Sequence, residues 1–211
     1  MSTATPTAST THHALSGGAG DALPGLRGRT FLITGATSGI GRSIALALGR
    51  HGAHVVVTGR REQEGRSLEK ELREIGASAG GGAKAAFVRG DVTDEAHIKS
   101  AVETAVGLGG RLDGALNNAG VELGGIPVTE STPEQYRQVF DVNVLGVLLA
   151  MKHQIRAMLA DGKGGSIVNT ASCVGRVGMP TTGVYAASKA AVISLTRTAA
   201  LKVAKQKIRV N

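Results

Sequence analysis

Aromatic residues and cysteines are scarce in this chain of 211 residues. It has no tryptophan, and its aromatic residues are Phe31, Phe87, Phe140, Tyr136 and Tyr185. The core must therefore consist of Val, Ile, Leu and Ala, and the stacking platforms that single-stranded nucleic acid needs are lacking. Cys173 is the only cysteine, so no disulfide can form within the chain, and a reducing, cytoplasmic location is predicted. We expect Cys173 to be a small buried thiol, since no histidine lies near it in sequence to make it a nucleophile.

Long apolar runs are also lacking. The longest, residues 142–151, is broken by Asn143 and Gly146 and is shorter than the roughly 20 residues that span a bilayer. Residues 1–26 contain neither the arginines of a transit peptide nor a continuous apolar signal core. We therefore predict a disordered extension over residues 1–26, one folded domain over residues 27–211, and no membrane partner.

The formal net charge of +8 raises the question of an anionic partner. The basic residues are scattered and never form a run of five, which argues against a nucleic-acid partner and favours attraction of an anionic small molecule. The histidines show no metal-ligand spacing with cysteine or carboxylate partners, so no metal site is predicted.

Short apolar segments alternate with helical patterns along the chain. Near-continuous apolar strands of this kind predict a parallel sheet covered by helices on both faces, an α/β doubly wound fold in one domain. Thr132, Pro133 and Gln135 form a capping box at the start of one long helix, and Thr93 is expected to cap another. Strands are expected at residues 29–34, 54–58, 87–88, 112–116, 164–172 and 208–211, helices at 42–52, 63–75, 93–108, 132–159 and 182–205, and a flexible loop at 76–86.

A glycine-rich segment, TGATSGIG at residues 34–41, follows the first predicted strand. Gly35 would leave the strand by a tight turn, Gly39 would let the backbone approach a pyrophosphate, and Gly41 would let the helix pack on the strand. The helix N-terminus would face the anion with free N–H groups and its dipole. Although glycine patterns also occur in ordinary loops, this one lies between a buried strand and a helix and therefore predicts a dinucleotide site.

The end of the second strand bears on which dinucleotide binds. An acidic residue there would hold a ribose 2′-hydroxyl, but this chain has Gly59 followed by Arg60 and Arg61. An arginine fork binds a 2′-phosphate, and Ser38 can add a hydroxyl. The pattern favours NADP(H), with NAD(H) as the alternative; an arginine that merely faces solvent would give the same sequence.

A hydroxyl, a phenol and an ammonium stand in one segment. Ser172 precedes Tyr185 by thirteen residues, and Lys189 follows Tyr185 by four, which places the last two on one helical face. A cation there would lower the pKa of the phenol and make it a usable proton donor. A Tyr–Lys pair at this spacing is also a common surface feature, so this segment alone does not distinguish a catalytic pair from a surface pair.

Taken together, these motifs resemble the short-chain dehydrogenase/reductase family. The matching elements occur in order and cover roughly residues 28–211: TGATSGIG at 34–41, Asp91-Val92, NNAG at 117–120, Asn143 within DVNVLG, Ser172 within SIVNTAS and YAASK at 185–189. The resemblance implies a Rossmann-like fold and an NADP-preferring oxidoreductase acting on a ketone or secondary alcohol. It also implies a homo-oligomer, dimer or tetramer, formed through the two long helices.

The resemblance also implies a role for each matching residue. Tyr185 would donate or accept the proton, and Ser172 would hydrogen-bond the substrate oxygen. Lys189 would lower the pKa of Tyr185 and bind the nicotinamide ribose, while Asn143 would hold a water linking Lys189 to solvent. Asp91 would contact the adenine. The implied cofactor-binding residues are Gly35, Thr37, Ser38, Gly39, Ile40, Gly41, Arg60, Arg61, Asp91, Val92, Asn117, Asn118, Ala119, Gly120, Tyr185 and Lys189.

The end of the chain departs from the family pattern. Family members continue past the IRVN of residues 208–211 into a segment bordering the nicotinamide, a substrate-covering loop and a last strand. Either the chain is a piece of a longer protein, or it lacks the last strand and part of the substrate pocket. A nucleotide-binding sensor or an inactive fragment on the same fold is therefore the alternative to an active enzyme. The intact Ser172, Tyr185 and Lys189 set argues against that alternative.

Overall fold

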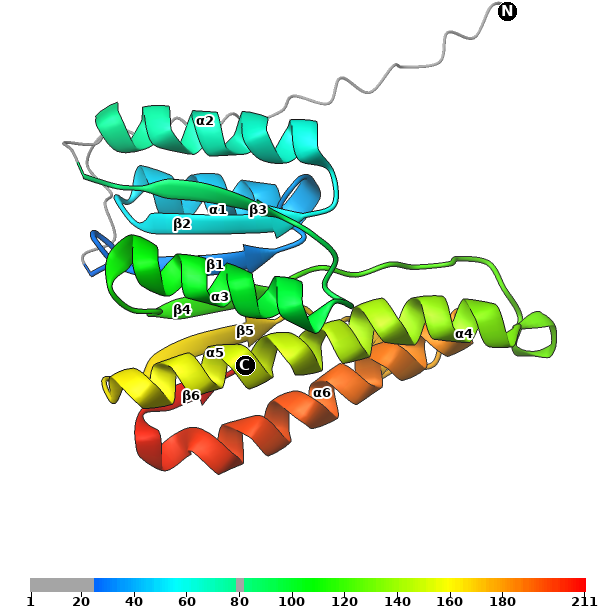
Figure 1. The fold of residues 1–211 in the computed structure, drawn as a ribbon. Helices are drawn as coiled ribbons and strands as arrows, with labels where there is room; N and C mark the ends of the chain where they lie inside the picture. Colours follow the sequence, from blue (N-terminus) through cyan, green and yellow to red (C-terminus); the bar gives the residue numbers. More distant parts are fainter. Residues whose placement is uncertain (1–24, 79–81) are drawn as a thin grey trace, which may run out of the picture.

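A parallel sheet lies between two layers of helices (Figure 1). The computed structural model describes residues 25–78 and 82–211, and most of the expected disordered extension therefore lies outside the described residues. The strands are β1 (Thr30–Thr34), β2 (His54–Gly59), β3 (Ala85–Arg89), β4 (Gly114–Asn117), β5 (Gly165–Asn169) and β6 (Ile208–Val210). The α-helices are α1 (Gly39–Arg50), α2 (Glu62–Ser78), α3 (Glu95–Gly109), α4 (Pro133–Phe140), α5 (Gly146–Asp161) and α6 (Gly183–Val203).

The order of the strands creates a crevice at one edge of the sheet. All neighbours are parallel, in the order β3-β2-β1-β4-β5-β6, so the chain moves outward from β1 to β3 and then returns to place β4 on the other side of β1. Leu32 packs on the face covered by α3, α5 and α6, whereas its neighbour Ile33 packs on the face covered by α1 and α2. The predicted doubly wound, Rossmann-like α/β fold is confirmed, and ligands bind such sheets where the strand order reverses.

The predicted elements are present with shifted ends. The capping box at the start of α4 is confirmed: Gln135 N donates to Thr132 Oγ1 at 3.3 Å, and Thr132 N donates to Gln135 Oε1 at 2.9 Å. The expected loop at residues 76–86 is shorter than predicted, because α2 continues to Ser78 and β3 begins at Ala85; residues 79–81 of it lie outside the described residues.

The long helix predicted for residues 132–159 is divided. A π-helical turn, Asp141–Leu145, joins α4 to α5, and Gly146 N donates to Asp141 O across it. Asn143, fully buried, lies in the middle of this turn. Wide turns of this kind insert one residue into a helix and change the direction of the side chains around it, frequently at functional sites. Apolar periodicity continues through the turn, which is why the sequence pattern missed it.

Two local predictions were wrong. Asp94, not Thr93, caps α3, since its Oδ1 accepts from Ala96 N at 2.9 Å. The Thr93 amide and hydroxyl instead both donate to Asp91 Oδ1 at 3.0 Å and so fix that carboxylate. Cys173, expected to be buried, is exposed because it begins a short 3-10 turn directly after β5 leaves the sheet.

Candidate active site

The glycine turn after β1 is built on close backbone approaches. Gly35 has a φ of +65°, and a methyl group on it would lie 2.6 Å from Ala119 Cα. A methyl group at Gly41 would lie 2.6 Å from Gly35 O and 2.7 Å from Asn118 Nδ2. Asn118 Nδ2 itself donates to Gly35 O at 3.1 Å. The absence of side chains therefore lets the turn, the start of α1 and the segment after β4 lie against one another.

The N-terminus of α1 faces the same crevice with its charge uncompensated. The first turn of α1 has no acidic residue, and the Ser38 side chain at the N-cap makes no capping hydrogen bond. Free N–H groups and the positive end of the helix dipole are thus available to an anion. This matches the expectation drawn from the glycine spacing.

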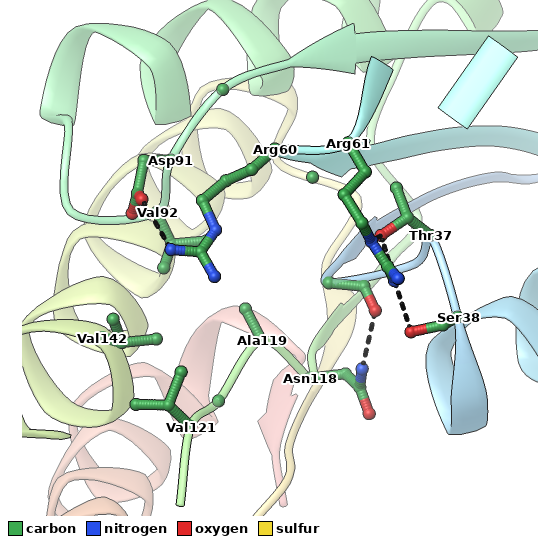
Figure 2. A pocket seen from close by; sticks show the side chains of 14 residues that line it. Thr37, Ser38, Arg60, Arg61, Asp91, Val92, Asn118, Ala119, Val121 and Val142 are labelled. Atoms are coloured by element: carbon green, nitrogen blue, oxygen red, sulfur yellow. Dashed lines mark hydrogen bonds and ion pairs between the residues drawn. The ribbon is translucent and has the colours of Figure 1, made fainter. Parts of the chain in front are cut away.

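Arg61 lies over the hydroxyl groups of the glycine turn. Its Nη2 donates to Ser38 Oγ at 2.5 Å and to Thr37 Oγ1 at 2.9 Å, and its Nε donates to Thr37 Oγ1 at 3.2 Å (Figure 2). The guanidinium also lies 3.8 Å from Glu64, one turn into α2. A cation and two hydroxyls therefore meet at the end of β2, where no carboxylate follows Gly59 directly.

Arg60 points to a different part of the crevice. Its Nη1 lies 3.7 Å from Asp91 Oδ2, and its side chain is largely exposed (Figure 2). The two neighbouring arginines, grouped together by the sequence argument, are thus separated by the structure. Arg61 contacts the glycine turn after β1, whereas Arg60 contacts the segment after β3.

A pocket of about 440 Å³ joins these features, a volume within the range of small-molecule sites (Figure 2). Ten of the predicted cofactor residues line it: Gly35, Thr37, Ser38, Arg60, Arg61, Asp91, Val92, Asn118, Ala119 and Gly120. Four further lining residues, Gly59, Gly90, Val121 and Val142, had not been assigned to it. Small apolar residues carry little sequence signal, although each of the four directly follows a strand or adjoins a recognised motif.

Several predicted cofactor residues do not line this pocket. Gly39, Ile40 and Gly41 belong to the first turn of α1 behind it, and the Ile40 side chain is exposed. The Asn117 side chain is buried in the core, where its amide pairs with Gln154 and Asn169. Asn117 is therefore placed to support the neighbouring segment rather than to contact a ligand with its side chain.

Lys189 brings the catalytic candidates together. Its buried ammonium donates to Thr170 O at 2.8 Å and lies 5.6 Å from the centre of the Tyr185 ring. A methyl group on Gly120 would lie 3.5 Å from Lys189 Nζ and 3.2 Å from Asn143 Oδ1. The end of the cofactor pocket at Gly120 therefore adjoins Lys189 and Asn143.

Asn143 is held by both functional groups of its amide. Its Nδ2 donates to Val121 O at 2.9 Å and to Ser188 Oγ at 3.0 Å, and its Oδ1 accepts from Val121 N at 2.8 Å. Both side-chain N–H groups are thus occupied by protein. A water linking Lys189 to solvent, as the family resemblance implies, would therefore have to donate to the second lone pair of Asn143 Oδ1 rather than accept from Nδ2.

Tyr185 is half-buried near Ser172, and its pKa is shifted upward. Burial is the main cause, and the Glu122 and Cys173 charges act in the same direction. A hydrogen bond with the Ser172 hydroxyl acts against them. The pKa of Tyr185 is thus raised rather than lowered as predicted, because removing the phenolate from water costs more than the Ser172 hydrogen bond returns. Burial also lowers the pKa of Lys189.

Among the described residues, no group of three or more His, Cys, Asp or Glu side chains could hold a metal ion. None of the helices within residues 25–78 and 82–211 is long and apolar enough to cross a membrane.

The fold and the pocket define a dinucleotide-binding protein. Glycines at positions 35 and 41 leave room for close backbone approach, the α1 N-terminus and Arg61 suit anionic phosphates, and the pocket continues toward Lys189. This donor set fits the phosphates of a dinucleotide.

Comparison with known proteins agrees with this class. Residues 29–211 match the family model described as short chain dehydrogenase. The chain is 44% identical over 186 residues to 2,5-dichloro-2,5-cyclohexadiene-1,4-diol dehydrogenase of Sphingobium indicum, covering 88% of this chain and 71% of that protein. It is 42% identical over 181 residues to cyclohexanol dehydrogenase of an Acinetobacter species, with 85% and 69% covered. The solved structure of NAD+-bound xylitol dehydrogenase superimposes with a TM-score of 0.82 at 34% identity, with 89% and 69% covered.

The chain belongs to the short-chain dehydrogenase/reductase family. It is therefore an NAD(P)-dependent oxidoreductase that acts on small-molecule alcohols or carbonyl compounds.

Proposed function

We propose that this enzyme transfers hydride between NADP(H) and a ketone or secondary alcohol, with Tyr185 as the general acid and base. The observation that carries the proposal is the Lys189 ammonium, held at Thr170 O beside the Tyr185 ring at the end of the cofactor pocket. Ser172, the remaining partner, lies near enough to Tyr185 to lower the pKa of the phenol. The bound cofactor supplies or accepts the hydride.

The chain's own groups handle the proton and the substrate oxygen. In carbonyl reduction, the neutral Tyr185 phenol donates its proton to the developing alkoxide. In alcohol oxidation, the Tyr185 phenolate accepts the hydroxyl proton, and the nearby Lys189 ammonium stabilises the negative phenolate. Ser172 would orient the substrate oxygen toward the phenol. Asn143, fixed by Val121 and Ser188, would support the wall between Lys189 and the cofactor pocket.

The preference for NADP(H) rests on Arg61. Its guanidinium and the Thr37 and Ser38 hydroxyls form a donor cluster at the end of β2, where a carboxylate would be needed to select a ribose 2′-hydroxyl. A guanidinium binds a phosphate with two parallel hydrogen bonds and full charge complementarity. Arg60, engaged with Asp91, would instead border the adenine.

The test is to measure the Kd of NADPH and of NADH by fluorescence titration, and then turnover with a panel of cyclic and open-chain ketones and secondary alcohols. We expect tighter binding of NADPH than of NADH, oxidation of NADPH by ketones and reduction of NADP+ by secondary alcohols, both followed at 340 nm. A clear preference for NADH would overturn the cofactor assignment. Tight NADPH binding without turnover of any substrate would favour a nucleotide sensor.

We also propose that the enzyme is a homo-oligomer formed through α5 and α6. Leu148 and Leu159 on α5 and Leu201 on α6 are exposed, and such large apolar side chains gain free energy when a second copy covers them. Light scattering after size-exclusion chromatography tests this proposal. A monomer at micromolar concentration would overturn it.

A further inference from the structure

A network of buried amide side chains lies in the core behind the catalytic residues. Asn117 Nδ2, at the end of β4, donates to Gln154 Oε1 on α5 at 3.0 Å, and Gln154 Nε2 donates back to Asn117 Oδ1 at 2.8 Å. Gln154 is fully buried and Asn117 is 1% exposed. The two amides therefore satisfy each other in a region with no access to water.

A second arm of the network reaches α6. Asn117 Nδ2 also donates to Asn169 Oδ1 at 2.8 Å, at the end of β5. Asn169 Nδ2 donates to Thr196 Oγ1 on α6 at 2.9 Å, and the Thr196 hydroxyl donates to Val192 O at 2.7 Å. Two strands and two helices are thus joined by directional hydrogen bonds rather than by apolar contacts alone.

Each strand end in the network is followed at once by a functional segment. After Asn117 come Asn118, Ala119 and Gly120, which line the cofactor pocket. After Asn169 comes Thr170, whose carbonyl holds the Lys189 ammonium. Thr170 N also donates to Asn117 O at 2.9 Å, which ties the two strand ends directly.

A purely stabilising role would not require amides at these positions. Well-packed apolar side chains stabilise a core at least as well as buried polar groups, which must give up water before they pair. What a network of buried hydrogen bonds adds is a preferred orientation, because other arrangements leave more buried donors or acceptors unpaired. The place where this orientation matters is the junction of the cofactor pocket with Lys189.

We propose that Gln154, Asn169 and Thr196 are positioning residues, which hold the 118–120 segment and the Thr170–Lys189 pair in fixed relation to each other. The proposal rests on the function proposed above, since it assigns these residues to the alignment of Lys189 and Tyr185 with the cofactor. None of the three side chains lines the cofactor pocket, so their effect passes through Asn117 and Thr170.

The first test compares Thr196→Val with Thr196→Ser in the full chain. Valine keeps the shape but removes the hydroxyl, so the Asn169 amide keeps only the weak acceptor Met151 Sδ, at 3.2 Å, and the Thr170–Lys189 pair should loosen. We expect kcat for alcohol oxidation to fall about tenfold and its pH profile to move upward by about half a unit as the ammonium leaves Tyr185. Thr196→Ser keeps the hydroxyl and should keep the wild-type rate and profile.

The second test addresses the other arm with Gln154→Met. Methionine fills the same space but leaves Asn117 with one partner fewer, so the 118–120 segment should lose its fixed position. We expect the Kd of NADPH to rise about tenfold. Leu72→Val is the matched control, because it removes one buried methylene from α2 on the opposite face of the sheet and should lower Tm alone.

The outcomes separate the inference from the proposed function. The positioning role would be overturned if Thr196→Val and Gln154→Met lowered only Tm, as Leu72→Val is expected to do. It would also be overturned if Thr196→Ser lowered kcat as much as Thr196→Val. Wild-type turnover and NADPH affinity are recorded in the same experiments, so a failure of the function itself is seen independently. The Gln154→Met titration needs no substrate.

Discussion

The Lys189 ammonium and the Thr170 carbonyl form a hydrogen bond of 2.8 Å that joins α6 to the segment directly after β5. The bond sets the position of a buried cation 5.6 Å from the centre of the Tyr185 ring. Thr170 lies two residues before Ser172, so one short segment supplies both the anchor of the cation and the hydroxyl that meets the phenol. This arrangement makes the proton chemistry of Tyr185 the first property to test.

Replacing Tyr185 by phenylalanine should abolish turnover while leaving the cofactor bound. The change removes the phenol proposed to exchange the proton, and general acid–base catalysis contributes about 10²- to 10⁴-fold to a rate. Steady-state kinetics should show a loss of that order in kcat, and fluorescence titration should show a Kd for NADPH close to that of the wild type. Wild-type turnover by the Tyr185→Phe variant would contradict the assignment.

The raised pKa of Tyr185 predicts opposite pH dependences for the two directions. Carbonyl reduction uses the neutral phenol, so its rate should hold at neutral pH and fall only as the pH rises through the raised pKa. Alcohol oxidation uses the phenolate, so its rate should still be increasing in alkaline solution.

Glu122 gives a way to move this pKa. Its carboxylate raises the pKa of Tyr185, so Glu122→Gln should lower that pKa and shift the oxidation profile to lower pH by about a few tenths of a unit. The shift should diminish at high salt, because Glu122 is exposed and its field is screened. The control is Glu130→Gln, which removes the same charge from the 3-10 turn further along that segment. Equal shifts in the two variants would show that net charge alone is responsible.

The fold and the position of most candidate site residues could be predicted from the sequence because both depend on short patterns. Apolar runs of strand length between helical patterns define a parallel sheet, and a parallel sheet gathers strand ends at one edge. Residues at strand ends, such as Asp91 and Asn118, therefore lie together in the pocket as expected. Ten of the predicted cofactor residues line it for this reason.

Features that depend on side-chain direction could not be predicted in this way. Nothing in the order Arg60-Arg61 indicates that one side chain turns to Asp91 and the other to Ser38. The balance between burial, which raises the pKa of Tyr185, and the Ser172 hydrogen bond, which lowers it, depends on depth, which spacing does not encode. The exposure of Cys173 likewise follows from the path of the chain after β5.

The division between the two arginines leads to a specific prediction for cofactor choice. Arg61→Ala should weaken NADPH binding about ten- to hundredfold, the range expected for losing hydrogen bonds of about 1.5–3 kcal/mol to a charged group. NADH, which lacks the 2′-phosphate, should be much less affected. Arg60→Ala is the matched control and should weaken both cofactors to a similar, smaller extent. Equal losses of NADPH affinity in the two variants would count against a special role for Arg61.

Gly41 tests whether the backbone contact between α1 and the segment after β4 supports cofactor binding. In Gly41→Ala the added methyl would lie 2.6 Å from Gly35 O and 2.7 Å from Asn118 Nδ2, so α1 must move away from both. Overpacking of this kind costs about 1–3 kcal/mol, which outweighs the gain of up to about 1 kcal/mol in helix propensity. We expect a lower Tm together with weaker NADPH binding, because Gly35 and Asn118 both line the pocket.

In Gly107→Ala, the matched control on α3, the new methyl meets no atom within 4 Å, so only the propensity gain acts and Tm should rise with the Kd unchanged. A Gly41→Ala enzyme with the Tm and Kd of the wild type would show that α1 can shift without disturbing the site.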